Sequence, residues 1–518
     1  MKGPSNGTLT PGPTAPEAPL PDAPGAPQPF TRAAQGLAPG RSPGVGSSDP
    51  MAPLRRPDFR RVWIAAGVSN IGNWMETFGV RWAMTYLTMA EVWVKAGYPP
   101  AATMLAVLAA AQLLPVLFLG MLGGIVADRV DRRRMLIVTQ GVLMLTAAAL
   151  AVASATGHAT ATVMLVISVV HGTTMAFNVP AWQVLTPRLV TRDELPQAIA
   201  LNSLQFNMAR VVGPLAAGLL MFGSDPTLLF AINALSFLGV IVAVWKTPPA
   251  PPAPGQGERG LLKGGWSDTR QAVRFVFSNK GPRAVFLGVS LFSILAGPLL
   301  LQMPAFVTQV YGEKEAVGSA LLAIMGAGAV LGAFMLPRLP TWYPRHHFIP
   351  LSMACGGLSI AMFCAVPDPL FGGAIMFLVG LFWIWSFSSS IAAMQLLVDD
   401  SIRGRVMAVT NTAIFGASPL GALITAGVEW LVLRTGWERA PALGVQLGLG
   451  VCALVLLAAA VVMLTWRTPE VDGLKPGDEG YDRKPGLLRG ILASGHRPRP
   501  TEVEATVDAT GSGEAGTL

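Results

Sequence analysis

Long apolar runs, separated by short polar segments, dominate the chain between residues 62 and 466. A helix needs about 20 mostly apolar residues to cross the hydrocarbon of a bilayer, and each run is near that length. The alternation of polar and apolar residues that marks membrane barrels is absent from these runs. The pattern therefore predicts an all-α integral membrane protein with twelve transmembrane helices: 62–86, 101–126, 135–156, 160–182, 197–221, 226–246, 284–308, 316–336, 347–366, 370–396, 406–431 and 440–466.

The composition agrees with this pattern. Hydrophobic residues make up 52% of the 518 residues and charged residues 13%, whereas soluble domains are about 25% charged. The three cysteines lie inside apolar runs without a metal-ligand spacing, and no phosphate-binding GxxxxGK[ST] motif occurs. We therefore expect no enzyme, no cofactor and no metal site.

The positive charges predict an orientation. Of the 37 lysines and arginines, 31 fall in the tails and in the loops on the same side, four fall in the opposite loops, and two fall within spans. Cytoplasmic loops are enriched in these residues. We expect a multi-pass protein of the inner (cytoplasmic) membrane with both termini in the cytoplasm, and the basic balance then needs no nucleic-acid partner.

A long loop after the sixth span divides the chain into two sets of six. It begins with the stiff proline-rich segment 248–252 and continues into an amphipathic stretch, 266–278, that is typical of a helix lying on a membrane surface. Both tails have the composition of disordered segments. The expected organisation is a disordered tail (1–53), a six-helix bundle (54–246), a linker with an interfacial helix (247–283), a second six-helix bundle (284–466) and a disordered tail (467–518).

The two halves share an order of short motifs. Asn202-Ser203 is followed by Ala217-Gly218 in the fifth span, and Asn411-Thr412 is followed at the same spacing by Ala426-Gly427 in the eleventh. These positions are topologically equivalent in the two halves. The shared order favours a parallel internal repeat, as in transporters built from two related bundles.

The loop between the second and third spans contains the most specific motif. It resembles the signature loop of the major facilitator superfamily, in which glycine, aspartate and basic residues stand at fixed spacing; Asp131 departs from the pattern, which has a second glycine there. In that family the loop latches the two halves when the transporter opens outward. The matching residues are Gly124, Asp128, Arg129, Arg133 and Arg134.

Further segments are similar to the subgroup that contains the enterobactin exporter and related drug:proton antiporters. They include 58–63, 69–75, 201–214 and the Arg403-Gly404-Arg405 turn before span eleven, and the similarity covers about residues 54–466. The resemblance implies two six-helix bundles that rock around a midplane substrate site, in a protein that works as a monomer in the lipid bilayer. It fixes no substrate.

Charged residues inside spans are costly, so they indicate function or a partner. Glu76 lies near the middle of span one, Arg81 lies five residues further on, and Arg210 lies in span five. Glu76 either loads and releases a proton, or forms a structural ion pair with one of the two arginines. The remaining candidates for proton coupling or the substrate cavity are Asn70, Asn73, Thr77, Asn207 and His171.

Span five also contains Gly213, Pro214 and Gly218, which resemble the kinked antiporter motif of exporter families. Proline frees a backbone carbonyl and can kink a helix. The alternative is that these small residues serve helix packing alone. Glu429 lies near the outer end of span eleven, and we expect it at the interface with the headgroups.

These features predict a secondary transporter that exports small hydrophobic or amphipathic molecules from the cytoplasm, with protons as the coupling ion. One alternative keeps the fold and makes the protein a dedicated exporter of a siderophore or other secondary metabolite, because Arg81 and Arg210 suit an acidic cargo. A second alternative is a membrane scaffold or sensor that no longer transports.

Overall fold

The computed structural model describes residues 49–221, 225–249, 263–338, 345–437, 440–466, 468 and 471. All of these belong to one unit of the chain, 49–518. Most of the two expected tails, and residues 250–262 of the expected linker, lie outside the described residues.

Twelve long helices coincide with the twelve expected spans. Ten of them are long and apolar enough to cross a membrane by length and composition, and the other two, α1 and α6, contain Glu76, Arg81 and Arg210. The helices are α1 (Pro57–Met89), α3 (Ala101–Arg129), α4 (Arg132–Ala155), α5 (Ala161–Leu189), α6 (Leu195–Leu220), α7 (Thr227–Trp245), α9 (Lys280–Phe306), α10 (Glu315–Met335), α11 (Arg345–Ala365), α12 (Pro369–Leu397), α13 (Asp400–Leu433) and α14 (Ala440–Leu464).

Short elements mark the two ends of these helices. The α2 end is where α1 finishes, α2 (Glu91–Lys95) follows and α3 begins; the α8 end is where α1 begins and α8 (Lys263–Ser278) lies. One turn of π-helix, η3 (Val307–Tyr311), follows α9 at the α2 end. The other short elements are 3-10 turns: η1 (Ala52–Arg55), η2 (Arg192–Glu194) and η4 (Leu336–Arg338).

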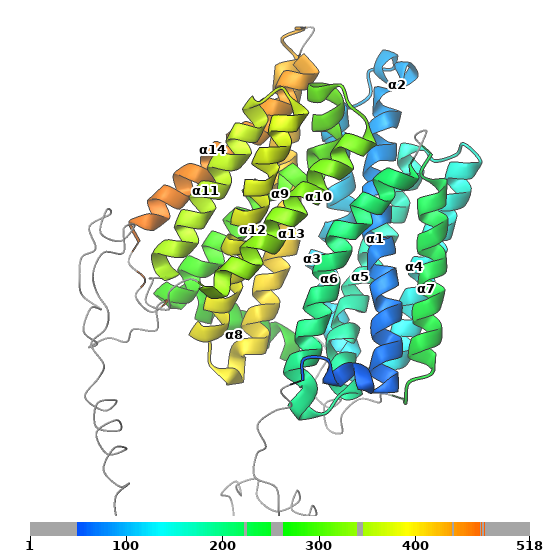
Figure 1. Cartoon of the computed structure of the whole chain (residues 1–518), viewed down its shortest axis with the longest axis vertical. Coiled ribbons are helices and arrows are strands. Elements are labelled where there is room, and N and C mark those ends of the chain that lie inside the picture. The colour runs from blue at the N-terminus through cyan, green and yellow to red at the C-terminus, as the bar shows by residue number, and fades with distance from the viewer. Residues whose placement is uncertain are drawn as a thin grey trace, which may run out of the picture. The chain divides into compact units, whose positions relative to one another are not determined.

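The helices form two bundles (Figure 1). In the first, α1 packs on α6 and α7, α4 on α5 and α7, and α3 on α5. In the second, α9 packs on α13 and α14, α11 on α12 and α14, and α10 on α12. The bundles meet where α3 lies along α13 and α6 lies along α10. This arrangement gives the expected two-bundle membrane fold.

Equivalent helix pairs in the two bundles pack through reciprocal glycines. A Cβ atom on Gly123 of α3 would lie 2.0 Å from the carbonyl oxygen of Ala176, and one on Gly172 of α5 would lie 2.2 Å from that of Gln112. In the second bundle, the α10–α12 pair repeats this arrangement through Gly328 and Gly380, with corresponding distances of 1.9 and 1.8 Å. Small residues let membrane helices approach backbone to backbone. The repetition supports the internal repeat that the sequence predicts.

Helix α8 packs against the second bundle. Ala272 and Val276 are buried, while Arg270 and Arg274 on the same helix are exposed. Its neighbours are α9 and α13. Ala272 and Val276 thus face the protein, while Val273 and Phe277 stay exposed. The placement of α8 on a membrane surface remains a prediction.

Candidate substrate cavity and buried polar network

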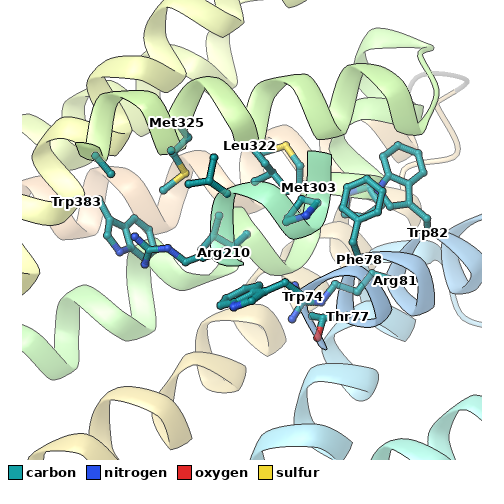
Figure 2. Close-up of a pocket in the computed structure, with 16 residues that line it drawn as sticks. Trp74, Thr77, Phe78, Arg81, Trp82, Arg210, Met303, Leu322, Met325 and Trp383 are labelled. Carbon is teal, nitrogen blue, oxygen red and sulfur yellow. The ribbon is translucent and has the colours of Figure 1, made fainter. Parts of the chain in front are cut away.

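A cavity lies between the bundles, with about 740 Å³ of empty space that includes its opening to solvent. Helices α1 and α6 of the first bundle and α9, α10 and α12 of the second contribute to its wall (Figure 2). Most of the wall is aromatic or aliphatic. The lining residues are Trp74, Thr77, Phe78, Arg81, Trp82, Arg210, Val211, Pro214, Leu300, Met303, Pro304, Leu322, Met325, Gly326, Ala329 and Trp383.

Among the described residues that line this wall, Arg81 and Arg210 are the only ionisable ones, and both belong to the first bundle. Neither guanidinium forms an ion pair or a side-chain hydrogen bond with the described part of the chain. A cation that is removed from water without a partner is costly, and guanidinium groups match carboxylate geometry with two parallel hydrogen bonds. The cavity is therefore suited to an anionic group held between apolar walls.

The glycines of α6 set the distance between the cavity helices. A Cβ atom on Gly213 would lie 2.4 Å from Cβ of Trp74 in α1, and one on Gly218 would lie 2.0 Å from Oγ of Ser319 in α10. Helix α6 continues through Pro214, which lines the cavity. The expected kink motif thus lies where α6 contacts one helix of each bundle.

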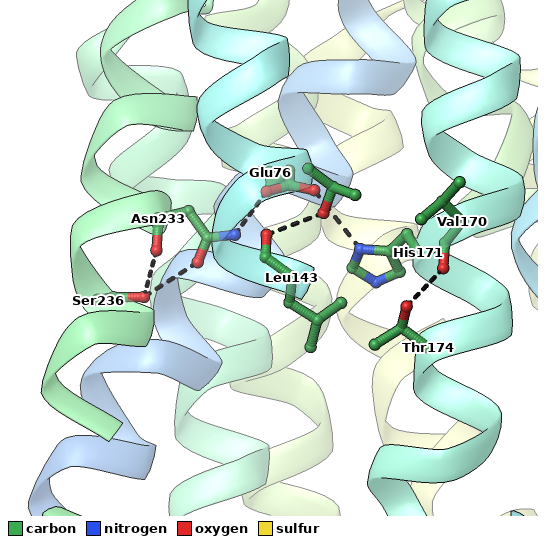
Figure 3. Close-up of polar contacts among 8 residues, drawn as sticks. Glu76, Leu143, Val170, His171, Thr174, Asn233 and Ser236 are labelled. Carbon is green, nitrogen blue, oxygen red and sulfur yellow. Dashed lines mark hydrogen bonds and ion pairs between the residues drawn. The ribbon is translucent and has the colours of Figure 1, made fainter. Parts of the chain in front are cut away.

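Glu76 faces the interior of the first bundle (Figure 3). Its carboxylate accepts a 2.6 Å hydrogen bond from Nδ2 of Asn233 in α7, and its other oxygen lies 3.6 Å from Nδ1 of His171 in α5. Ser236 donates to the Asn233 side-chain oxygen over 3.1 Å. Glu76 is 5% exposed and Asn233 is fully buried. The group is a compact, buried polar network joining α1, α5 and α7.

The structure thus separates the candidate residues into two sites. Thr77, Arg81 and Arg210 share the cavity, whereas Glu76 and His171 share the polar network. The contacts of Glu76 are with Asn233 and His171, and neither arginine is among them. A structural ion pair between Glu76 and Arg81 or Arg210 is therefore absent from the described contacts.

The other amide candidates lie outside both groups. Asn207 is exposed, and its side chain donates a 2.8 Å hydrogen bond to the carbonyl of Ser203 on its own helix. Asn70 and Asn73 are half-buried on α1. The side-chain oxygen of Asn73 is buried without a hydrogen-bond partner in the described part of the chain.

Asp131 stands where the signature loop has its second glycine, and its side chain caps the helix that follows. Its carboxylate accepts from the backbone N–H groups of Arg133 and Arg134, at 2.9 and 3.2 Å, and so caps the start of α4. Arg133 donates to the carbonyl of Trp245 in α7. Gly124 and Arg129 are in α3, while the side chain of Asp128 lies outside the described residues.

Arg403 and Arg405, the two arginines of the turn before span eleven, lie at the α8 end. Arg403 donates to the carbonyl of Val398 at 3.0 and 3.2 Å, which closes the turn before α13. Arg405 donates a 2.9 Å hydrogen bond to Gln271 of α8. The pair therefore ties α13 to the turn before it and to the surface helix.

Sequence reasoning missed Asn233 and Gln302. Asn233 is the single amide side chain in the apolar helix α7. A lone amide in an apolar span indicates a buried hydrogen-bond partner, so the sequence does contain a signal for it. Gln302 is a similar exception in α9, where it is fully buried.

The fold, the cavity between two bundles and the buried charged residues define a membrane transporter of the major facilitator superfamily. The chain belongs to the transmembrane secretion effector family, whose model matches residues 48–484. It is therefore a multi-pass membrane transporter and not an enzyme.

Two curated relatives match about two thirds of this chain at low sequence identity. The staphyloferrin A transporter of Staphylococcus aureus (strain NCTC 8325 / PS 47) is 23% identical over 360 residues, which are 68% of this chain and 85% of the relative. The enterobactin exporter EntS of Escherichia coli O1:K1 / APEC is 22% identical over 347 residues, which are 66% of this chain and 80% of the relative.

Solved structures share the fold. An inward-facing, unoccupied bacterial homologue of the human lysosomal transporter Spinster matches with a TM-score of 0.61 and 13% identity, covering 86% of this chain and 99% of that one. A D-xylose–proton symporter matches with a TM-score of 0.60 and 16% identity, covering 80% and 99%.

Proposed function

We propose that this transporter exports anionic, siderophore-type metabolites from the cytoplasm, in exchange for protons. Cargo would enter the cavity from the α8 end and leave at the α2 end as the two bundles rock. The relatives named for staphyloferrin A and enterobactin support this substrate class. Between the two candidate cargoes that the sequence leaves open, the cavity favours the acidic one.

The observation that supports an anionic cargo most directly is the pair of guanidinium groups in the cavity. Arg81 and Arg210 line it without a described acidic partner. Iron-chelating metabolites present oxygen donors that ionise, and these would supply the missing counter-charge. The aromatic side chains Trp74, Phe78 and Trp383 would pack against the rest of such a molecule.

The buried network around Glu76 supports proton coupling. Glu76 is the acidic group of the network, and His171 offers a second titratable group 3.6 Å away. Thr77, the next residue in α1, lines the cavity, so a change of charge at Glu76 would act on the helix that also holds Arg81. Coupling would then pass through α1 from the network to the cavity.

The charge distribution supports the orientation. With both termini in the cytoplasm, 31 of the 37 lysines and arginines lie on the inner side or in the tails. The α8 end would then face the cytoplasm, and α8 would lie on the inner membrane surface. We propose that the protein acts in this orientation as a monomer in the inner membrane.

Transport in everted vesicles tests the substrate class. Each vesicle preparation is offered matched anionic and cationic aromatic probes, with the wild type, Arg210→Ala and Arg210→Lys compared. We expect selective uptake of the anionic probe by the wild type, loss in the alanine variant and partial retention in the lysine variant. Equal uptake of both probes, unaffected by Arg210→Ala, would instead favour small hydrophobic cargo, which the apolar wall also accommodates.

A further inference from the structure

Two stripes of side chains run along the exposed side of helix α8. Val273 and Phe277 form an apolar stripe and are 36% and 45% exposed, while Arg270 and Arg274 form a basic stripe that is exposed as well. The two members of each stripe are four residues apart, so they share one face of the helix. At about 3.6 residues per turn, the apolar stripe lies between the basic stripe and the side that packs on the second bundle.

The two arginines of the basic stripe have no described counter-charge. Neither Arg270 nor Arg274 forms an ion pair or a side-chain hydrogen bond in the part of the chain that the structure describes. Like charges four residues apart on a helix repel each other. An anion bound beside both guanidinium groups would therefore stabilise the helix.

The positive charge continues into the first turn of α9, the helix that follows. Lys280 and Arg283 are exposed there, and the sequence from Arg270 to Arg283 contains four basic residues and no acidic one. Leu287, one turn beyond Arg283 on the same face of α9, is 38% exposed. Because α9 is long and apolar enough to cross a membrane, this order of side chains is typical of a helix passing from the headgroup layer into hydrocarbon.

Contacts with the second bundle fix which side of α8 is exposed. Gln271 accepts a 2.9 Å hydrogen bond from Arg405 of α13. Phe277 packs edge-on against Phe286 of α9, with the ring centroids 5.6 Å apart. The apolar stripe therefore adjoins the start of α9, and the basic stripe is held away from the protein.

We propose that α8 and the first turn of α9 form a binding surface for the anionic phospholipids of the bilayer. The phosphate groups would bind the exposed arginines, since guanidinium forms charge-assisted hydrogen bonds with phosphate oxygens. The acyl chains would cover the apolar stripe and Leu287. A soluble anion would leave these apolar side chains in water, and a zwitterionic lipid would leave the positive charge uncompensated, so the pairing of the two stripes favours an anionic lipid. The surface lies outside the cavity, and its occupancy is independent of cargo and coupling ion.

Lipid titrations of the full chain test this proposal. Phosphatidylglycerol or phosphatidylcholine is added to the detergent-solubilised protein, and native mass spectrometry counts the bound lipids. We expect the wild type to bind phosphatidylglycerol more tightly. A basic residue near an anionic surface contributes about 1 kcal/mol, so Arg270→Gln and Arg274→Gln should each weaken the apparent affinity for phosphatidylglycerol about fivefold. The affinity for phosphatidylcholine should stay unchanged.

Arg60→Gln and Arg192→Gln are the matched control variants. Both arginines are exposed and belong to the first bundle, where Asp58 and Asp193 are close to them in sequence. We expect both variants to bind phosphatidylglycerol as the wild type does. Glycerol phosphate, which carries the charge of a headgroup without acyl chains, should not displace the lipid.

Three outcomes would overturn the proposal. The first is wild-type affinity for phosphatidylglycerol in folded Arg270→Gln and Arg274→Gln. The second is an equal loss of affinity in the Arg60 and Arg192 variants, which would mean that total charge alone attracts the lipid. The third is displacement of the lipid by glycerol phosphate, which would identify a site for soluble anions instead.

Discussion

Asn233 donates a 2.6 Å hydrogen bond to Glu76 although 157 positions separate them in the chain. The bond joins α7 to α1 in the interior of the first bundle, and His171 of α5 lies on the other carboxylate oxygen. Three helices therefore converge on one acidic group. We therefore expect a change in the charge of Glu76 to alter the packing of α1, α5 and α7.

Glu76→Gln should abolish proton-driven transport while preserving the fold. The amide oxygen can still accept the hydrogen bond from Asn233, but the side chain no longer exchanges a proton. Proton flux and substrate accumulation in everted vesicles provide the measurement, with downhill exchange of substrate as the control for binding. Full proton-driven accumulation in this variant would rule out Glu76 as the coupling residue.

Asn233→Leu should destabilise the first bundle. It removes the hydrogen bond to a buried carboxyl group, and such bonds contribute about 1.5–3 kcal/mol when one partner is charged. Ser236→Ala, which removes the 2.7 Å bond to the backbone carbonyl of Asn233 and the 3.1 Å bond to its side-chain oxygen, leaves the bond to Glu76 in place and should cost less. Unfolding of the purified protein in detergent would rank the stability of the two variants. An equal loss of stability in both would contradict the larger contribution expected from Asn233.

Gly213→Ala should weaken the contact between α1 and α6. The added Cβ atom would lie 2.4 Å from Cβ of Trp74 and 3.0 Å from the carbonyl oxygen of Ile71, and overpacking of this kind costs about 1–3 kcal/mol. Gly239→Ala in α7 is the matched control, because nothing lies within 4 Å of its added atom. Thermal unfolding of both variants would show whether the close approach is required.

Gly124→Val tests the expected latch function of the signature loop. In the present conformation nothing lies within 4 Å of a Cβ atom at Gly124, so we expect wild-type thermal stability. If the loop closes against the second bundle in the opposite conformation, the larger side chain should lower the transport rate. Wild-type transport by this variant would show that the glycine is dispensable there.

The ion pair between Arg56 and Glu194 should make a small, pH-dependent contribution to stability. The hydrogen bond from the Arg56 guanidinium lowers the pKa of Glu194 below its usual value. Stability is therefore present above the unfolded-state pKa of about 4.3 and is lost as the pH falls through the folded-state value. Because the Arg56 side chain remains 42% exposed, Glu194→Gln should cost less than about 1 kcal/mol at pH 7.

Unfolding at pH 7 and at the lowest pH that the protein tolerates provides the measurement. The difference in stability between wild type and Glu194→Gln should shrink at the lower pH. A difference that grows on acidification would show that the ion pair does not lower the pKa of Glu194.

The sequence predicts the spans well because each is set by a local property, its run of apolar residues. The short helix α2, with five residues, has no such run and could not be predicted. The sequence also points to Glu76, Arg81 and Arg210, since charge inside a span is visible without a structure. It cannot show that Glu76 turns toward Asn233 while Arg81 turns into the cavity, because that depends on which helices surround α1.

Glu429 shows the same limit. Its place near the end of a span predicts its depth in the membrane, and depth alone favours the headgroup region. Glu429 is instead fully buried, because α13 packs between α3 and α14 and Gly444 of α14 makes room for the side chain.

The reciprocal glycines of the α3–α5 and α10–α12 pairs have a practical consequence. Because these pairs touch through backbone atoms at their glycines, no side chain separates the two helices at those points. The spacing between α3 and α5 should stay constant while the spacing between α3 and α13 changes. A probe pair on α3 and α5 would thus serve as an internal ruler, against which distance changes measured elsewhere in the protein can be calibrated.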